Sequence, residues 1–207
     1  MKSDTTANYQ QPYDGALVTE EAAPVLSMHP KKFLMWLIIV SSIMVFAAFT
    51  SAYLVRRGEG NWLTFELPPI FYISSVVIVL SSVTMHWAYY SASKDNLLSL
   101  KIAILMTAAL GLLFTYMQVQ GWQQLIDVGV YFGGKDSNPA GSFVYVLTAV
   151  HIGHLALAFG LLGIILYRVF TYQVHAKNLA AIEICTTFWH FLGAMWLYLF
   201  VFLLVNH

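Results

Sequence analysis

Five ionisable side chains lie inside apolar stretches of this sequence, where a hydrocarbon environment would penalise them: His86, His151, His154, Glu183 and His190. His151 and His154 are one helical turn apart, so they project from similar directions on a helix. Glu183 and His190 are seven residues apart and share a face for the same reason. Imidazole and carboxylate groups are the ligands that metal ions and haem use in proteins. One hypothesis is therefore a metal or haem site.

The alternative is that these groups have structural roles, as hydrogen-bonded packing or contacts with lipid headgroups. Depth in the membrane separates the two hypotheses. Glu183 and His86 lie near the cytoplasmic ends of their predicted helices, whereas His151 and His190 lie near mid-membrane. His154 lies between these two levels. Because the groups do not converge on one point, we predict no metal site and no catalytic residue in the chain.

The carboxylate of Glu183 needs a partner, because a charge inside a membrane persists only when it is paired or hydrogen-bonded. The nearest candidate is His154, on the helix that precedes Glu183 in the chain. We predict that the two side chains face one interior groove, directly or through water or a phospholipid headgroup. Trp189, next to His190, joins the suspected structural or lipid-binding core.

The elements that position these residues are predicted to be transmembrane helices. The chain has 207 residues, of which 59% are hydrophobic and only 10% are charged, against roughly 25% charged in soluble domains. Five apolar runs are each long enough to cross about 30 Å of hydrocarbon. The fold class is thus an all-α integral membrane bundle of five helices, near 33–55, 69–90, 97–119, 142–168 and 179–205.

The rest of the chain is polar or short. Residues 1–28 are predicted to be a disordered or extended cytoplasmic tail, and residues 29–207 form the membrane domain. The one long connection, 120–141, carries an amphipathic piece, Trp122 to Val130, that is expected on the membrane surface. A net charge of zero argues against a nucleic-acid partner.

Lysine and arginine counts predict the orientation of the helices, because positive residues favour the cytoplasmic side. Seven lie on the side of the N-terminal tail and three on the opposite side. The seven are Lys2, Lys31, Lys32, Lys94, Lys101, Arg168 and Lys177; the three are Arg56, Arg57 and Lys135. The N-terminus is therefore predicted in the cytoplasm and the C-terminus outside.

The fourth predicted helix carries a stripe of small residues: Ala149, Gly153, Ala156, Gly160 and Gly163. Their 4-3-4-3 spacing is that of a close helix contact, in which small side chains let two backbones approach. His151 and His154 lie on a different face. We predict that this helix is interior to the bundle and that the small stripe packs closely, either within the bundle or against a partner.

Two motifs resemble a known family. The first motif begins at Glu183 and continues, after five residues, with Trp189-His190-Phe191 and, after four more, with Trp196-Leu197-Tyr198-Leu199-Phe200. It resembles the E-x5-WHF-x4-WLxLF pattern in the last helix of haem–copper oxidase subunit III. Thr148 to His154, TAVHIGH, resembles the T-G-F-H-G-L-H segment of the preceding helix. The resemblance covers about residues 30–205.

The sequence departs from the family pattern in three respects. It resembles the short five-helix bacterial form, which lacks the first two of seven helices. Ser42 stands where the family often has a glutamate, and Gly193 stands where an aspartate is common. Roles assigned to that glutamate are therefore not carried over to this chain.

The resemblance implies a non-catalytic subunit of a respiratory terminal oxidase in the bacterial inner membrane. Haem and copper would belong to partner subunits I and II, and this chain would hold none, although it would bind phospholipid. It would stabilise subunit I and support proton uptake in a proton-translocating cytochrome c oxidase. Its partners would be subunits I and II, and they could include subunits of other respiratory complexes. Two alternatives remain: a subunit III of a quinol oxidase or nitric-oxide-reductase-associated complex, and an independent His-ligated membrane metalloprotein.

Overall fold

The computed structural model describes residues 30–135, 137–171 and 179–206. These residues form five α-helices: α1 (Pro30–Gly58), α2 (Ile70–Ser93), α3 (Leu97–Asp127), α4 (Pro139–Phe170) and α5 (Ala180–Asn206). Each helix is long and apolar enough to cross a membrane. The predicted all-α bundle of five spanning helices is confirmed. The predicted tail, 1–28, lies outside the described residues.

The largest difference from the predicted boundaries is the length of α3, which continues to Asp127 instead of ending near residue 119. The extra two turns are held against the bundle. Gly121 lies against the ring of Phe71, Leu125 is fully buried, and the indole nitrogen of Trp122 donates to the hydroxyl of Thr148 (2.9 Å). Residues 122–127, predicted to belong to a separate amphipathic piece of the connection, are thus the last turns of α3.

Asparagine side chains begin two of the helices. Asn96 accepts a hydrogen bond from the backbone N–H of Ser99, at the start of α3, and Asn138 accepts from Ala140, at the start of α4. Such bonds satisfy N–H groups that a helix leaves free in its first turn. The amide of Asn138 also donates to the carbonyl of Asn61, which ties the α1–α2 connection to the start of α4.

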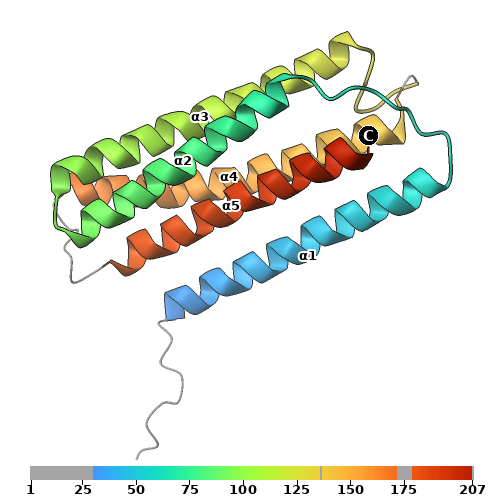
Figure 1. Cartoon of the computed structure of the whole chain (residues 1–207). Helices are drawn as coiled ribbons and strands as arrows, with labels where there is room; N and C mark the ends of the chain where they lie inside the picture. Colours follow the sequence, from blue (N-terminus) through green and yellow to red (C-terminus); the bar gives the residue numbers. More distant parts are fainter. Residues whose placement is uncertain (1–29, 136, 172–178, 207) are drawn as a thin grey trace, which may run out of the picture.

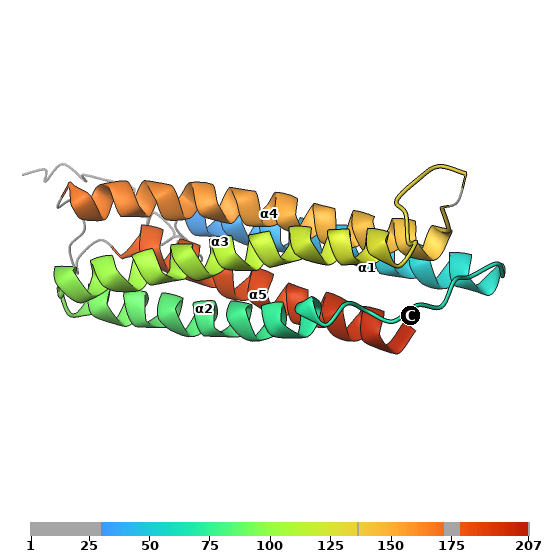
Figure 2. The same cartoon turned by 90° about the horizontal axis from the view of Figure 1, so that it is seen from above.

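The helices are not equally interconnected. Helices α2 and α3 form an antiparallel hairpin with the most extensive contact in the bundle, and α5 contacts α1, α2 and α4. Among the described helices, α1 contacts α4 and α5 and neither α2 nor α3. Figures 1 and 2 show α1 at one side of the bundle, separated from the α2–α3 hairpin by α5 and α4.

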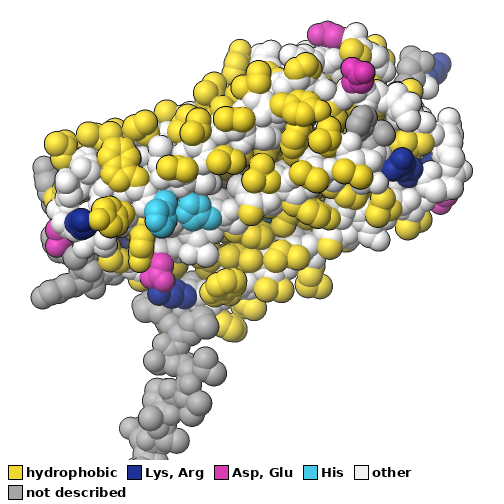
Figure 3. All heavy atoms as spheres, in the orientation of Figure 1, with side chains coloured by type: hydrophobic (Ala, Val, Ile, Leu, Met, Phe, Trp, Pro, Cys, Tyr) yellow, Lys and Arg dark blue, Asp and Glu magenta, His cyan; other side chains and the backbone are white. Residues whose placement is uncertain are grey.

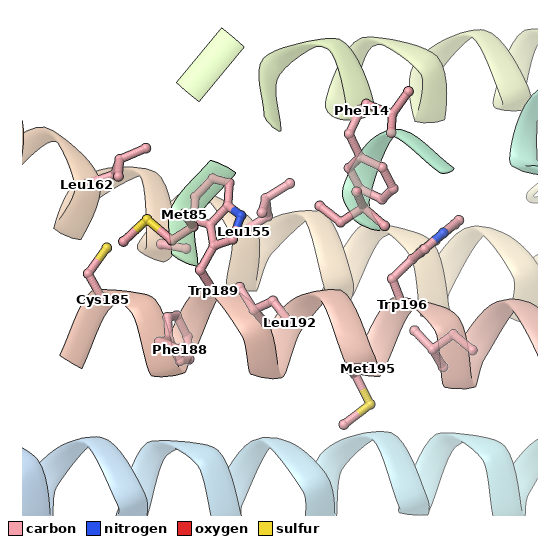
Figure 4. Close-up of a cluster of buried hydrophobic side chains, with 14 of the residues drawn as sticks. Met85, Phe114, Leu155, Leu162, Cys185, Phe188, Trp189, Leu192, Met195 and Trp196 are labelled. Atoms are coloured by element: carbon pink, nitrogen blue, oxygen red, sulfur yellow. The ribbon is translucent and has the colours of Figure 1, made fainter. Parts of the chain in front are cut away.

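Two buried tryptophans of α5 fill the centre of the bundle. Trp189 and Trp196 are each 1% exposed, and both point away from α1, whereas Met195 points toward it (Figure 4). The Trp189 indole donates to the hydroxyl of Ser81 (3.0 Å), and the Trp196 indole donates to that of Ser75 (3.0 Å). Helix α5 is thereby fixed to α2 by two buried hydrogen bonds.

The small-residue stripe of α4 does not pack inside this chain. Its members Ala149, Gly153, Ala156, Gly160 and Gly163 are exposed, and a Cβ added at any of the three glycines would meet no described atom within 4 Å. Of the two predicted alternatives for this stripe, close packing within the bundle is therefore wrong. The buried face of α4 carries Leu147, Leu155 and Leu162 instead, because large side chains fill the space between helices that small ones would leave open.

Candidate functional site: three separate polar groups

The polar residues singled out in the sequence fall into three groups in different parts of the bundle. The first is formed by His151 and His154 on α4, of which His151 is fully buried. Its ring lies 5.4 Å from that of Trp196 and 6.0 Å from that of Phe114, centroid to centroid. Neither ring nitrogen has a hydrogen-bond partner among the described residues. His151 is enclosed by aromatic side chains.

His154 is one turn further along α4 and only partly buried. Its Nδ1 lies 2.8 Å from the carbonyl oxygen of Val150, so the ring bonds to its own helix. The ring of Phe46, on α1, lies 5.3 Å away. His154 therefore contributes to the contact between α1 and α4 and not to a shared ligand set.

Glu183 belongs to the second group. It has a partner, but the partner is not His154. Its carboxylate accepts a 2.7 Å hydrogen bond from the ammonium group of Lys32, near the start of α1. Because α4 and α5 are antiparallel, Glu183 lies at the level of the end of α4, whereas His154 is about 24 Å from that end along the helix axis. The predicted Glu183–His154 pair is wrong.

His86 on α2 and His190 on α5 form the third group, with ring centroids 6.1 Å apart. His86 is exposed and His190 partly exposed. The sequence analysis placed these two histidines at different depths, and the structure places them together. The matching depth follows from the antiparallel arrangement, since His86 is seven residues before the end of α2 and His190 ten residues after the start of α5.

The three groups do not combine into a larger one. Within the described ranges, no set of three or more His, Cys, Asp or Glu side chains is close enough to hold a metal ion. The groups instead join pairs of helices: Lys32 and Glu183 join α1 to α5, and His86 and His190 lie side by side on α2 and α5. Such pairs can form hydrogen bonds between helices and contacts with a neighbouring molecule, but they do not form a reaction centre.

The sequence analysis missed the serines of α2 that accept the buried hydrogen bonds. Besides Ser75 and Ser81, Ser74 accepts from the side-chain amide of Gln118 on α3 (3.0 Å), where both residues are fully buried. A signal existed in the sequence, because Ser74 and Ser81 are seven residues apart and share one helix face. The role of Lys32 gave no such signal, because it depends on how α1 packs.

Comparisons with known proteins agree with the fold. The family model described as cytochrome c oxidase subunit III matches residues 19–206. The chain is 27% identical over 181 residues to "Cytochrome c oxidase subunit 3" of Lemur catta, covering 81% of this chain and 63% of the relative. It is 28% identical over 181 residues to the protein of the same name from Rattus norvegicus, covering 81% and 66%.

A bacterial relative, "Probable cytochrome c oxidase subunit 3" of Rickettsia conorii, is 26% identical over 191 residues, covering 83% of this chain and 65% of the relative. The chain thus spans a little under two thirds of the length of these relatives. The family model, however, covers all five helices. The chain therefore belongs to the cytochrome c oxidase subunit III family.

Proposed function

We propose that this protein is the non-catalytic subunit III of a respiratory haem–copper terminal oxidase. In this role it stabilises subunit I, retains phospholipid and supports proton uptake at the cytoplasmic surface, while the reaction centre lies in partner subunits. The observation that carries the proposal is the family match over residues 19–206. The bundle geometry is consistent with it, because the polar residues lie at helix contacts and on the outer surface.

A groove between α1, α4 and α5 supports the lipid part of the proposal. Its volume is about 420 Å³. Aliphatic side chains such as Ile38, Leu161 and Ile184 line it, and Lys31, near the start of α1, and Arg168, near the end of α4, also line it. An acyl chain fits an aliphatic groove, and a phosphate is attracted to a lysine and an arginine at the membrane surface.

Purification of the tagged protein in mild detergent tests the subunit assignment. We expect membrane subunits I and II to co-purify, with haem and copper absorbance in the complex and a dinuclear copper motif in subunit II if cytochrome c is the electron donor. A subunit II without that motif would indicate a quinol oxidase. A chain that purifies alone, with no haem protein in any fraction, would refute the proposal.

The lipid role has its own test. Arg168→Met should reduce the anionic phospholipid retained by the purified complex, measured by mass spectrometry of extracted lipid. Arg57→Met, at the opposite end of α1, is the matched control, because it removes the same charge outside the groove. Equal lipid content in both variants would argue against the groove as a lipid site.

We also propose that the protein resides in the bacterial inner membrane with its N-terminus in the cytoplasm. The Lys and Arg distribution supports this orientation. A reporter that is active only in the cytoplasm should be active when fused before residue 1 and inactive when fused after His207. The reverse pattern would invert the orientation.

A further inference from the structure

His86 and His190 lie on the outer surface of the bundle, where a spanning protein meets either lipid or a neighbour. Their rings face each other at 6.1 Å between centroids, and neither ring hydrogen-bonds to a described residue. In Figure 3 the histidine side chains form one small patch within a largely hydrophobic surface. Two polar rings are thus presented outward without a partner in the described part of the chain.

The patch lies too deep for a phospholipid headgroup. His86 is seven residues before the end of α2, or about 10 Å along the helix axis. Lys94 follows that end, with its ammonium group over the ring of Tyr90, and a lysine at the end of a spanning helix is expected at the membrane surface. Hydrocarbon at the depth of His86 offers no hydrogen bond, and an unsatisfied polar group there is strongly unfavourable.

The surroundings of the patch have the form of a helix contact. On α5, His190 is followed at helical spacing by the exposed residues Ala194, Leu197 and Val201. On α2, Val83 and Tyr90 flank His86 and are 62% and 53% exposed. The small side chain of Ala194 lets a neighbouring backbone approach the histidines.

We propose that this α2–α5 face, centred on His86 and His190, is the docking surface for a membrane-spanning helix of a partner subunit. That helix presents a side-chain carboxylate at the depth of the histidines. A carboxylate has two oxygens and accepts one hydrogen bond from each imidazole, which satisfies both rings with one residue. This inference rests on the proposed function, because it requires that the chain is part of a membrane complex.

Site-specific photo-crosslinking in the intact complex tests the position of the surface. A photoreactive amino acid at Val83, one turn from His86, should crosslink to one co-purifying membrane subunit, within a spanning segment that contains an aspartate or glutamate. The matched control is Leu112, which is equally exposed (60%) but lies on α3 and should crosslink to no subunit. If the probe at Val83 captures only lipid while the complex is intact, the inference is overturned and the proposed function stands.

Substitution of the histidine tests its chemistry. His86→Leu should at least halve the amount of this chain retained on the partner subunits during detergent washes, whereas Val83→Leu should leave it unchanged. Replacing the partner's aspartate or glutamate by asparagine or glutamine should reduce retention by a similar amount. When this change is combined with His86→Leu, retention should fall no further, because both changes remove the same interaction. If the face contacts lipid, His86→Leu would instead leave retention unchanged and raise the thermal stability of the bundle, and either result would overturn the inference.

Failure of every oxidase subunit to co-purify with the wild-type chain would refute the proposed function itself.

Discussion

At the scale of single residues, the bundle is held together by hydrogen bonds between buried side chains on different helices. The indole of Trp189 and the hydroxyl of Ser81 are the clearest case, because both residues are almost completely buried. Within a bilayer such bonds matter because the alternative is an unsatisfied polar group in an apolar environment. Burial of apolar side chains drives helix association less in a bilayer than in water, since lipid tails are themselves apolar.

Trp189→Phe should destabilise the bundle by about 1–3 kcal/mol, because it removes the donor to Ser81 and leaves a space in the core. Unfolding in a series of detergent mixtures measures this change. Trp87→Phe is the control, since Trp87 is 41% exposed. Equal stability of the two variants would show that the hydrogen bond to Ser81 contributes nothing measurable.

The ion pair between Lys32 and Glu183 should contribute much less. Its two side chains are 35% and 43% exposed, and exposed ion pairs are typically worth about 0–1 kcal/mol. A double-mutant cycle with Glu183→Gln and Lys32→Met should give a coupling energy in that range, decreasing with added salt. A coupling energy above about 2 kcal/mol would mean that lipid or a partner shields the pair from water.

The sequence predicted correctly that Glu183 needs a partner, because that requirement depends only on its depth in the membrane. The identity of the partner was not predictable in the same way. Lys32 is 151 residues away in the chain, and only the packing of α1 beside α5 brings the two together. His86 and His190 were missed as a pair for the related reason that small errors in helix ends become errors in depth.

At the scale of helices, the glycines show which faces are in contact. A Cβ at Gly121 would lie 2.7 Å from the ring of Phe71, and one at Gly111 would lie 2.9 Å from the rings of Phe159 and Trp189. These positions on α3 require a glycine because neighbouring rings approach the backbone. The regular glycine spacing of α4, by contrast, coincides with an exposed face.

Gly121→Ala should lower the stability of the bundle by about 1–3 kcal/mol, because the added methyl group overlaps the buried Phe71 ring. Gly153→Ala should leave stability unchanged or raise it slightly, since its Cβ meets nothing and alanine favours a helix. Thermal unfolding of the two variants in the same detergent measures the difference. A large loss of stability in Gly153→Ala alone would reverse our assignment of the packed faces.

Helix number, type and approximate position were predictable because length and apolar composition alone determine whether a segment can span a membrane. The packed face of α4 was not, because small-residue spacing identifies a surface suited to close contact without specifying the neighbour. The end of α3 was not predictable either. Trp122 and Gln124 make residues 120–127 appear amphipathic, and the tertiary contacts of Gly121, Trp122 and Leu125 extend the helix.

At the scale of the whole molecule, the polar residues are spread along the outside and the helix contacts instead of surrounding one centre. We therefore expect the isolated chain to contain no stoichiometric haem, copper or iron. Elemental analysis after size-exclusion chromatography measures this directly. Stoichiometric metal that is lost on His86→Ala would contradict the expectation and identify the two imidazoles on α2 and α5 as ligands.

The position of α1 imposes an order on biosynthesis. Among the five described helices α1 is made first, yet the only ones of them it touches, α4 and α5, are made after the others. Lys32, near the start of α1, can pair with Glu183 only after a further 151 residues have been synthesised. At about 5–20 residues per second, this takes roughly 8–30 s. Meanwhile the α2–α3 hairpin can close as soon as it is inserted. A nascent chain arrested after α3 thus holds one completed hairpin and one solitary helix, and that solitary helix is the segment an insertase or chaperone would have to shelter until translation ends.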